Sequence, residues 1–198
     1  VPLPKGIVGI EDHPRQREYL TNLIYTESGL MRSPGIDSFG TGSGASRGAV
    51  TWSVNSKPYI VSGNRLLTTL EDGSTSDLGQ IPGSDDCFFS QGVINLVIGV
   101  KGGKGFRYNE TEGLKEITDP DYMPSVGADF IDGRHVFIPA DGSPAFYSEI
   151  DSAGTIEPLS FFDAEELPDL NKAVINISNQ LYILGGESVE VFRTNVDP

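Results

Sequence analysis

The sequence contains a unit of about 40 residues that recurs four times, and this repeat constrains the fold more than any other feature. The most regular part of the unit is a short apolar run, found at residues 59–63, 96–100, 136–140 and 182–186. These runs begin 37, 40 and 46 residues apart. A unit of this length is typical of repeat architectures, in which each unit buries its apolar face against its neighbours.

Each apolar run has strand-like segments on both sides. A short segment that ends at a polar turn precedes the run, and an alternating segment follows it. Leu66, Thr68 and Leu70, for example, share one face, because successive side chains of a strand point to opposite sides. Three of the units continue into a weaker fourth run. Asp-Gly pairs, which tolerate positive φ, provide three of the expected turns: residues 72–73, 132–133 and 141–142.

A four-stranded unit with this spacing is typical of a blade of a β-propeller. We therefore predict an all-β fold, a partial β-propeller with about four blades of four strands each. Residues 45–198 are expected to hold these blades, and further blades are expected after Pro198, because propellers close with roughly four to eight. A β-sandwich, which also spaces short strands with turns, is the alternative architecture.

Residues 1–44 do not fit the unit and are predicted to form an N-terminal arm and linker. We expect an extended arm with at most one short helix, because four apolar residues have roughly helical spacing: Tyr19, Leu20, Leu23 and Ile24. The Gly- and Ser-rich residues 40–48 are expected to form a flexible joint into the first blade.

The charge of the chain is strongly negative. It has 28 acidic and 14 basic residues, for a net charge of −14. Non-specific binding to nucleic acid depends on Lys and Arg at phosphates, so the composition argues against it. The single cysteine, Cys87, excludes an internal disulfide and is expected to be a buried apolar residue. No run approaches the length of about 20 apolar residues that a membrane helix needs.

Few residues are candidates for catalysis or for binding a metal or a cofactor, and we predict no catalytic, metal or cofactor site. His13 and His135 are the only histidines, expected in the arm and in a blade turn, and neither has the neighbours of a zinc site. The Gly- and Lys-rich residues 99–106 lack phosphate-loop spacing and are expected to form a hairpin. Three groups of carboxylates leave a glycosidase or lectin open as an alternative: Asp85 and Asp86, Asp119 and Asp121, and Asp163, Glu165, Glu166 and Asp169.

Three stretches, residues 19–36, 45–53 and 177–195, carry a resemblance to a known family. The first holds a Tyr-Leu-x-Asn segment followed by Gly-Leu-Met-Arg-Ser-Pro-Gly-Ile, and the second a Ser-Arg-Gly entry into a strand. In this order they resemble the packaged-DNA stabilisation proteins of short-tailed, tailspike-bearing bacteriophages, also described as tail accessory or head-completion proteins. The chain resembles the N-terminal part of such a protein.

The resemblance implies a structural protein of the virion tail that is not an enzyme. Such a protein closes the joint between portal and tail, retains the packaged DNA and forms part of the ejection conduit. The implied partners are sister subunits in a ring and the portal-adaptor and tail-needle proteins. DNA would pass without specific binding, and no membrane is involved. The implied location is the virion tail, with assembly in the bacterial cytoplasm.

The resemblance also suggests an interface in the arm, formed by Tyr19, Leu20, Arg32, Pro34 and Gly35. Proline fixes its own φ and biases the preceding residue toward an extended geometry, so this segment loses less entropy when it docks. We expect it to bind a partner or a sister subunit. The alternative is that it packs back on its own first blade.

Overall fold

The computed structural model describes residues 23–26, 29–32, 40–162 and 169–193. The chain divides into two compact units, residues 1–38 and 39–198. Among the described residues no helix is long and apolar enough to cross a membrane.

The first unit contains an antiparallel hairpin. Its strands are β1 (Leu23–Thr26) and β2 (Gly29–Arg32), paired from Leu23 opposite Arg32 to Thr26 opposite Gly29. Leu23 and Ile24, whose spacing suits a short helix, lie in β1 instead, and Tyr19 and Leu20 lie outside the described residues. The local sequence Leu-Ile-Tyr-Thr is rich in β-branched and aromatic residues, which favour strands. Gly29, with φ of 123°, supplies a backbone conformation that helps the chain to reverse.

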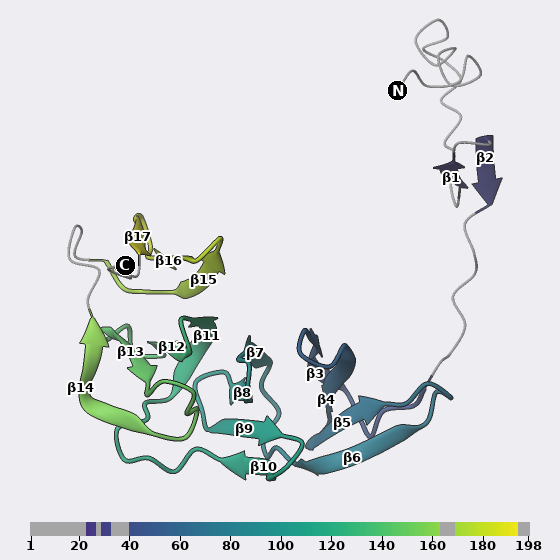
Figure 1. Cartoon of the computed structure of the whole chain (residues 1–198), viewed down its shortest axis with the longest axis horizontal. Helices are drawn as coiled ribbons and strands as arrows, with labels where there is room; N and C mark the ends of the chain where they lie inside the picture. The colour runs from purple at the N-terminus through teal and green to yellow at the C-terminus, as the bar shows by residue number, and fades with distance from the viewer. Residues whose placement is uncertain (1–22, 27–28, 33–39, 163–168, 194–198) are drawn as a thin grey trace, which may run out of the picture. The chain divides into compact units, whose positions relative to one another are not determined.

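The second unit consists of four antiparallel sheets that follow one another along the chain (Figure 1). The first sheet contains β3 (Ser46–Trp52), β4 (Lys57–Ser62), β5 (Arg65–Thr69) and β6 (Thr75–Gln80). The second sheet contains β7 (Cys87–Gln91), β8 (Leu96–Val100), β9 (Gly105–Asn109) and β10 (Gly113–Glu116). The third sheet contains β11 (Ser125–Ile131), β12 (Arg134–Pro139), β13 (Ala145–Ser148) and β14 (Ile156–Phe162). The fourth sheet contains β15 (Ala173–Ile177), β16 (Gln180–Leu184) and β17 (Val189–Arg193).

Within each sheet every strand pairs with the next strand in sequence. The prediction of four strands per unit is correct for three sheets, and the described part of the fourth sheet has three. Two-residue turns join the first two strands of the third and fourth sheets. Asp132 and Gly133 form one of them, Ser178 and Asn179 the other, and all four have positive φ. This is the turn geometry that matches the twist of a hairpin, and it explains the Asp-Gly pair at 132–133.

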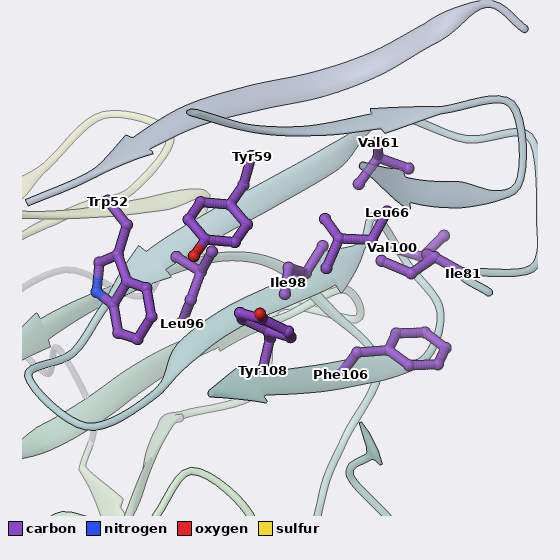
Figure 2. Packing of buried hydrophobic residues seen from close by; sticks show 10 residues of the cluster. All are labelled: Trp52, Tyr59, Val61, Leu66, Ile81, Leu96, Ile98, Val100, Phe106 and Tyr108. Atoms are coloured by element: carbon purple, nitrogen blue, oxygen red, sulfur yellow. The ribbon is translucent and has the colours of Figure 1, made fainter. Parts of the chain in front are cut away.

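The core lies between successive sheets. One apolar cluster joins the first and second sheets (Figure 2), another the second and third, and another the third and fourth. The second strands of the second and third sheets are the most buried. β8 is buried along its whole length and β12 at every position after Arg134, because a sheet covers each of their faces. β16 alternates instead, with Leu181 and Ile183 buried toward the third sheet. Four sheets packed in series differ from the two facing layers of a β-sandwich.

Candidate interaction surfaces

The interface predicted in the arm falls mostly outside the described residues. Tyr19, Leu20, Pro34 and Gly35 lie there. Arg32 is the last residue of β2, where its backbone pairs with Leu23, and its side chain is not described. The docking role of these five residues therefore remains a prediction.

The Ser-Arg-Gly motif has a structural role at the boundary between the first and second sheets. Arg47, on β3, is only 6% exposed. Its guanidinium donates to three backbone carbonyl oxygens: from Nε to Asp85 at 2.6 Å, and from Nη1 to Ile81 at 2.8 Å and Gly63 at 3.0 Å. Gly83, with φ of 110°, passes close to Nη2, and a Cβ there would lie 3.2 Å from that nitrogen. Arg47 thus ties a turn of the first sheet to the segment that leads into the second.

The opposite end of the same boundary is held by Trp52, the last residue of β3. Its indole Nε1 donates to the carbonyl oxygen of Gly92 at 2.8 Å, which lies in the first turn of the second sheet. The ring of Trp52 meets Tyr59 edge-on at 5.9 Å, and Tyr59 lies 5.4 Å from Tyr108 of the second sheet (Figure 2). The first two sheets are therefore fixed to each other at both ends, which favours a rigid body.

A buried serine–histidine pair links the second and third sheets. Ser90 Oγ on β7 and His135 Nδ1 on β12 are 2.7 Å apart, and the residues are 1% and 2% exposed. The expectation that His135 lies in a turn is wrong, because the turn before it has only two residues and β12 begins at Arg134. Burial lowers the pKa of His135 to about 3, so the imidazole is neutral near pH 7. No substrate can reach a serine this deeply buried, so the pair has a structural role.

Two of the carboxylates that left a glycosidase open, those of Asp119 and Asp169, hold loops together. Asp119 accepts backbone hydrogen bonds from Asp121 at 3.0 Å and Ile156 at 3.1 Å. Asp169 accepts from the backbone of Glu187 at 2.6 Å and from the hydroxyl of Ser188 at 2.7 Å, and these bonds hold its pKa below the usual range. A glycosidase acid needs a raised pKa, so Asp169 is unsuited to that role. Asp163, Glu165 and Glu166 lie outside the described residues.

Cys87 and His13 are the remaining residues that were considered for thiol or metal chemistry. No group of three or more potential metal ligands occurs in the part of the chain that the structure describes. Cys87 begins β7, is partly buried and packs on the cluster between the first two sheets. Burial raises the pKa of its thiol, so it is not activated as a nucleophile. His13 lies outside the described residues.

Two surface hollows lie at the end of the sheets where the turn between the first and second strands is found. A groove of about 370 Å³ lies beside the turns of the first and second sheets, and Trp52, Val54, Val93 and Glu110 are among its lining residues. Val54 is 53% exposed and Val93 65%. A second hollow, of about 270 Å³, lies between the third and fourth sheets, where the Arg134 guanidinium lies over the Tyr147 ring at 5.0 Å. These two hollows have apolar floors and charged rims, which suit contacts with proteins better than catalysis.

Sequence reasoning missed these hollows and the role of Arg47. Two adjacent apolar residues in a turn, Val93 and Ile94, were a signal for the groove. No local signal marks Arg47, because its acceptors lie 16 to 38 residues away in the sequence.

Comparison with known proteins decides the family. The family model described as "Bacteriophage P22 Gp10, beta-propeller" matches residues 7–197. The chain belongs to this family. Membership confirms the predicted fold, a β-propeller, and the coarser functional prediction, a phage stabilisation family whose members are structural proteins of the virion. No curated protein matches the chain.

Solved structures support the fold alone, because their sequence identities are low. Catalytically inactive virginiamycin B lyase from Staphylococcus aureus with quinupristin shares 17% identity at a TM-score of 0.51, over 89% of this chain and 64% of that one. YCF48 bound to D1 peptide shares 11% identity at a TM-score of 0.59, over 86% and 56%. The computationally designed Ika4 protein shares 14% identity at a TM-score of 0.56, over 81% and 99%. The chain therefore spans less than two thirds of the first two of these structures.

Proposed function

We propose that the protein is a tail component that closes the joint between portal and tail, retains the packaged DNA and forms part of the ejection conduit. The observation that carries this proposal is the family match over residues 7–197. The mechanism is assembly and plugging, without bond chemistry. Its free energy comes from contacts between subunits, and a rigid body loses little entropy when it docks.

The electrostatics of the chain support a conduit that does not hold DNA. The net charge of −14 opposes phosphate, and five Lys and Arg residues in the described part of the chain are paired with carboxylates. Five ion pairs with nitrogen–oxygen distances between 2.6 and 3.0 Å occur among the described residues: Lys57–Glu110, Arg65–Asp77, Lys104–Glu116, Arg107–Glu112 and Lys115–Glu112. These exposed pairs add little stability, but each occupies a group that could otherwise bind a phosphate.

The partners follow from the same proposal. Sister subunits form a ring between the portal adaptor and the tail needle, and the arm with Tyr19, Leu20, Arg32, Pro34 and Gly35 docks on one of them. Assembly takes place in the bacterial cytoplasm, and the finished protein resides in the virion tail.

A retention assay tests the proposal. DNA-filled particles made without this protein are expected to release DNA, and supplying the protein during assembly should restore nuclease-resistant DNA. A variant without residues 1–40 should fail to restore retention although its second unit keeps the same urea-unfolding curve. Full retention by particles that lack the protein would refute the proposed role. Full restoration by the deletion variant would refute the arm interface alone.

A gel-shift assay tests the conduit separately. Duplex DNA at physiological salt should show no shift with micromolar protein, because the chain carries 28 acidic and only 14 basic residues. Tight binding under these conditions would contradict a channel through which DNA slides.

A further inference from the structure

The turns that lie at one end of the sheets of the second unit form a surface of their own. When antiparallel strands follow one another in order, the turns after the first and third strands lie at one end of the sheet, and the turn after the second strand lies at the other. Hollows lined by turns of neighbouring sheets show that these ends of the first three sheets lie on the same side. We name this side the turn face, and its turns are residues 53–56, 70–74, 92–95, 110–112, 132–133 and 149–155.

The turn face exposes large apolar side chains. Five of them are between 47% and 65% exposed: Val54, Leu70, Val93, Ile94 and Ile150. The turns at the opposite end of the same three sheets, residues 63–64, 101–104 and 140–144, contain no large apolar residue. Because turns are normally polar, apolar side chains gathered in the turns of one end indicate a surface that another molecule covers.

The length of two of these turns exceeds what their hairpins need. Asp132 and Gly133 alone join the first two strands of the third sheet, whereas four residues join those strands in the first and second sheets. The longer turns carry Val54 and the adjacent pair Val93 and Ile94. Since two residues are enough to close a hairpin, the longer apolar turns point to binding and not to folding.

The charged residues in the turns of this face are all acidic. The turns contain no Lys or Arg and hold seven carboxylates: Glu71, Asp72, Glu110, Glu112, Asp132, Glu149 and Asp151. Strand cations neutralise two of them, since Lys57 pairs with Glu110, and Arg107 and Lys115 pair with Glu112. None of the other five forms an ion pair with a described residue. The turn face therefore combines apolar side chains with unpaired negative charge.

Hydrogen bonds fix the turns around the groove of about 370 Å³ that lies on this face between the first and second sheets. The backbone nitrogen of Ser53 donates to Oε1 of Gln91 at 2.9 Å, and Nδ2 of Asn55 donates to Oε1 of Glu110 at 3.2 Å. Both bonds join a turn of the first sheet to the second sheet. A preformed groove of this kind loses little conformational entropy when it binds.

We propose that the turn face binds a partner protein whose contact surface presents apolar side chains beside Lys or Arg. The groove between the first and second sheets receives the apolar side chains. The adjoining hollow, which shares Ile94 and Glu112 with the groove, includes the unpaired Asp151 and attracts the cations. Complementary charge favours this partner, and repulsion between carboxylates disfavours the pairing of two turn faces with each other. The inference goes beyond the proposed function, because it concerns a surface of the second unit and not the arm, and it specifies the chemistry of the partner.

Binding of a synthetic peptide to the 198-residue chain tests this chemistry. The probe is Lys-Ile-Lys-Val-Lys with an acetylated N-terminus and an amidated C-terminus. One control peptide has Glu in place of each Lys, and the other has Ser in place of Ile and Val. In an NMR titration at low salt, millimolar probe should shift the backbone amides of residues 53–56, 92–95 and 149–155, because these turns line the groove and the adjoining hollow. Neither control peptide should shift them to a comparable extent.

Two pairs of matched variants locate the binding. Val93→Ser should raise the dissociation constant of the probe at least about threefold, because it removes an apolar wall of the groove. Leu159→Ser, at a residue that is 82% exposed on β14 outside the turn face, should leave the constant unchanged. Asp151→Asn should weaken binding about twofold through the lost charge. Glu187→Gln removes one charge from a turn after a second strand and should have no such effect.

Several results would overturn the proposal. They are an absence of shifts at millimolar probe, equal shifts with the Glu-containing peptide, and equally tight binding of the probe to V93S and the wild type. Equal weakening by D151N and E187Q would also overturn it, because the probe would then be attracted by the net charge of the chain and not by this face. A dimer in sedimentation velocity that V93S abolishes would show that a second copy occupies the face, which contradicts a basic partner. Circular dichroism of each variant establishes that the chain remains folded.

Discussion

The buried imidazole of His135 should make the stability of the protein depend on pH in a direction that can be worked out. Its pKa is 6.5 in the unfolded chain and about 3 in the folded one, because burial against Ser90 and the Phe130 and Phe137 rings disfavours the charged form. At a pH between about 3 and 6.5, the imidazole binds a proton in the unfolded state but not in the folded state. Stability is therefore complete above about pH 6.5 and falls as the pH drops toward 3.

The size of the effect follows from the two pKa values. Each pH unit below 6.5 costs up to about 1.4 kcal/mol, which gives a loss of about 3 kcal/mol at pH 4. His135→Gln keeps a polar partner for Ser90 and cannot be protonated. At pH 7 this variant should be less stable than the wild type through lost packing, by about 1–2 kcal/mol. Its disadvantage should disappear, or reverse, at pH 4.

Urea unfolding at pH 7, 6, 5 and 4, followed by the fluorescence of Trp52, measures both curves. Carboxylates that take up protons over this range do so in both proteins, so the difference between the curves isolates the imidazole. His13→Gln, which changes the other histidine of the chain, is the control and should keep the pH slope of the wild type. Parallel curves for H135Q and the wild type would refute the reasoning.

Three further changes test the packing within the second sheet and at its boundary with the first, each by urea unfolding. Arg47→Met leaves three carbonyl oxygens without their charged donor and should lower the unfolding free energy by about 3–5 kcal/mol; an unchanged value would show that the bonds contribute nothing net. Gly99→Ala places a Cβ inside the Phe88 ring and should cost about 1–3 kcal/mol, whereas Gly127→Ala, with open space around its Cβ, should cost much less; equal effects would contradict the packing. Trp52→Phe loses its hydrogen bond and part of its volume and should cost about 2 kcal/mol; a neutral result would show that this end of the boundary is not held by the indole.

Most of the fold could be predicted from local patterns in the sequence. The alternation around Leu66 and Thr68 places these residues on the face that packs on the second sheet, as a period of two requires. The hairpin expected over residues 99–106 is confirmed, with Gly102 at φ of 71° between β8 and β9. These features depend on neighbours in the sequence, so the sequence alone was sufficient to predict them.

Features that depend on distant partners were not predictable in the same way. The spacing of Leu23 and Ile24 suits a helix, but the strand-forming residues around them and a turn at Gly29 favour a hairpin. The prediction that His135 lies in a turn was wrong because the length of that turn is set by the pairing of β11 with β12, which the sequence alone does not show. The acceptors of Arg47 come together only when two sheets pack, so its role could be found only in three dimensions.

An even number of antiparallel strands gives each complete sheet a mechanical property. The chain enters the first sheet at Ser46 and leaves it at Gln80. These residues lie on opposite edge strands but at the same end of the sheet, because Ser46 pairs with Ser62, Ser62 with Arg65, and Arg65 with Gln80. Tension applied along the backbone would therefore peel the strands apart a few hydrogen bonds at a time, whereas a push across the stack would be shared by the interfaces between sheets. Such a module yields readily to pulling but resists compression.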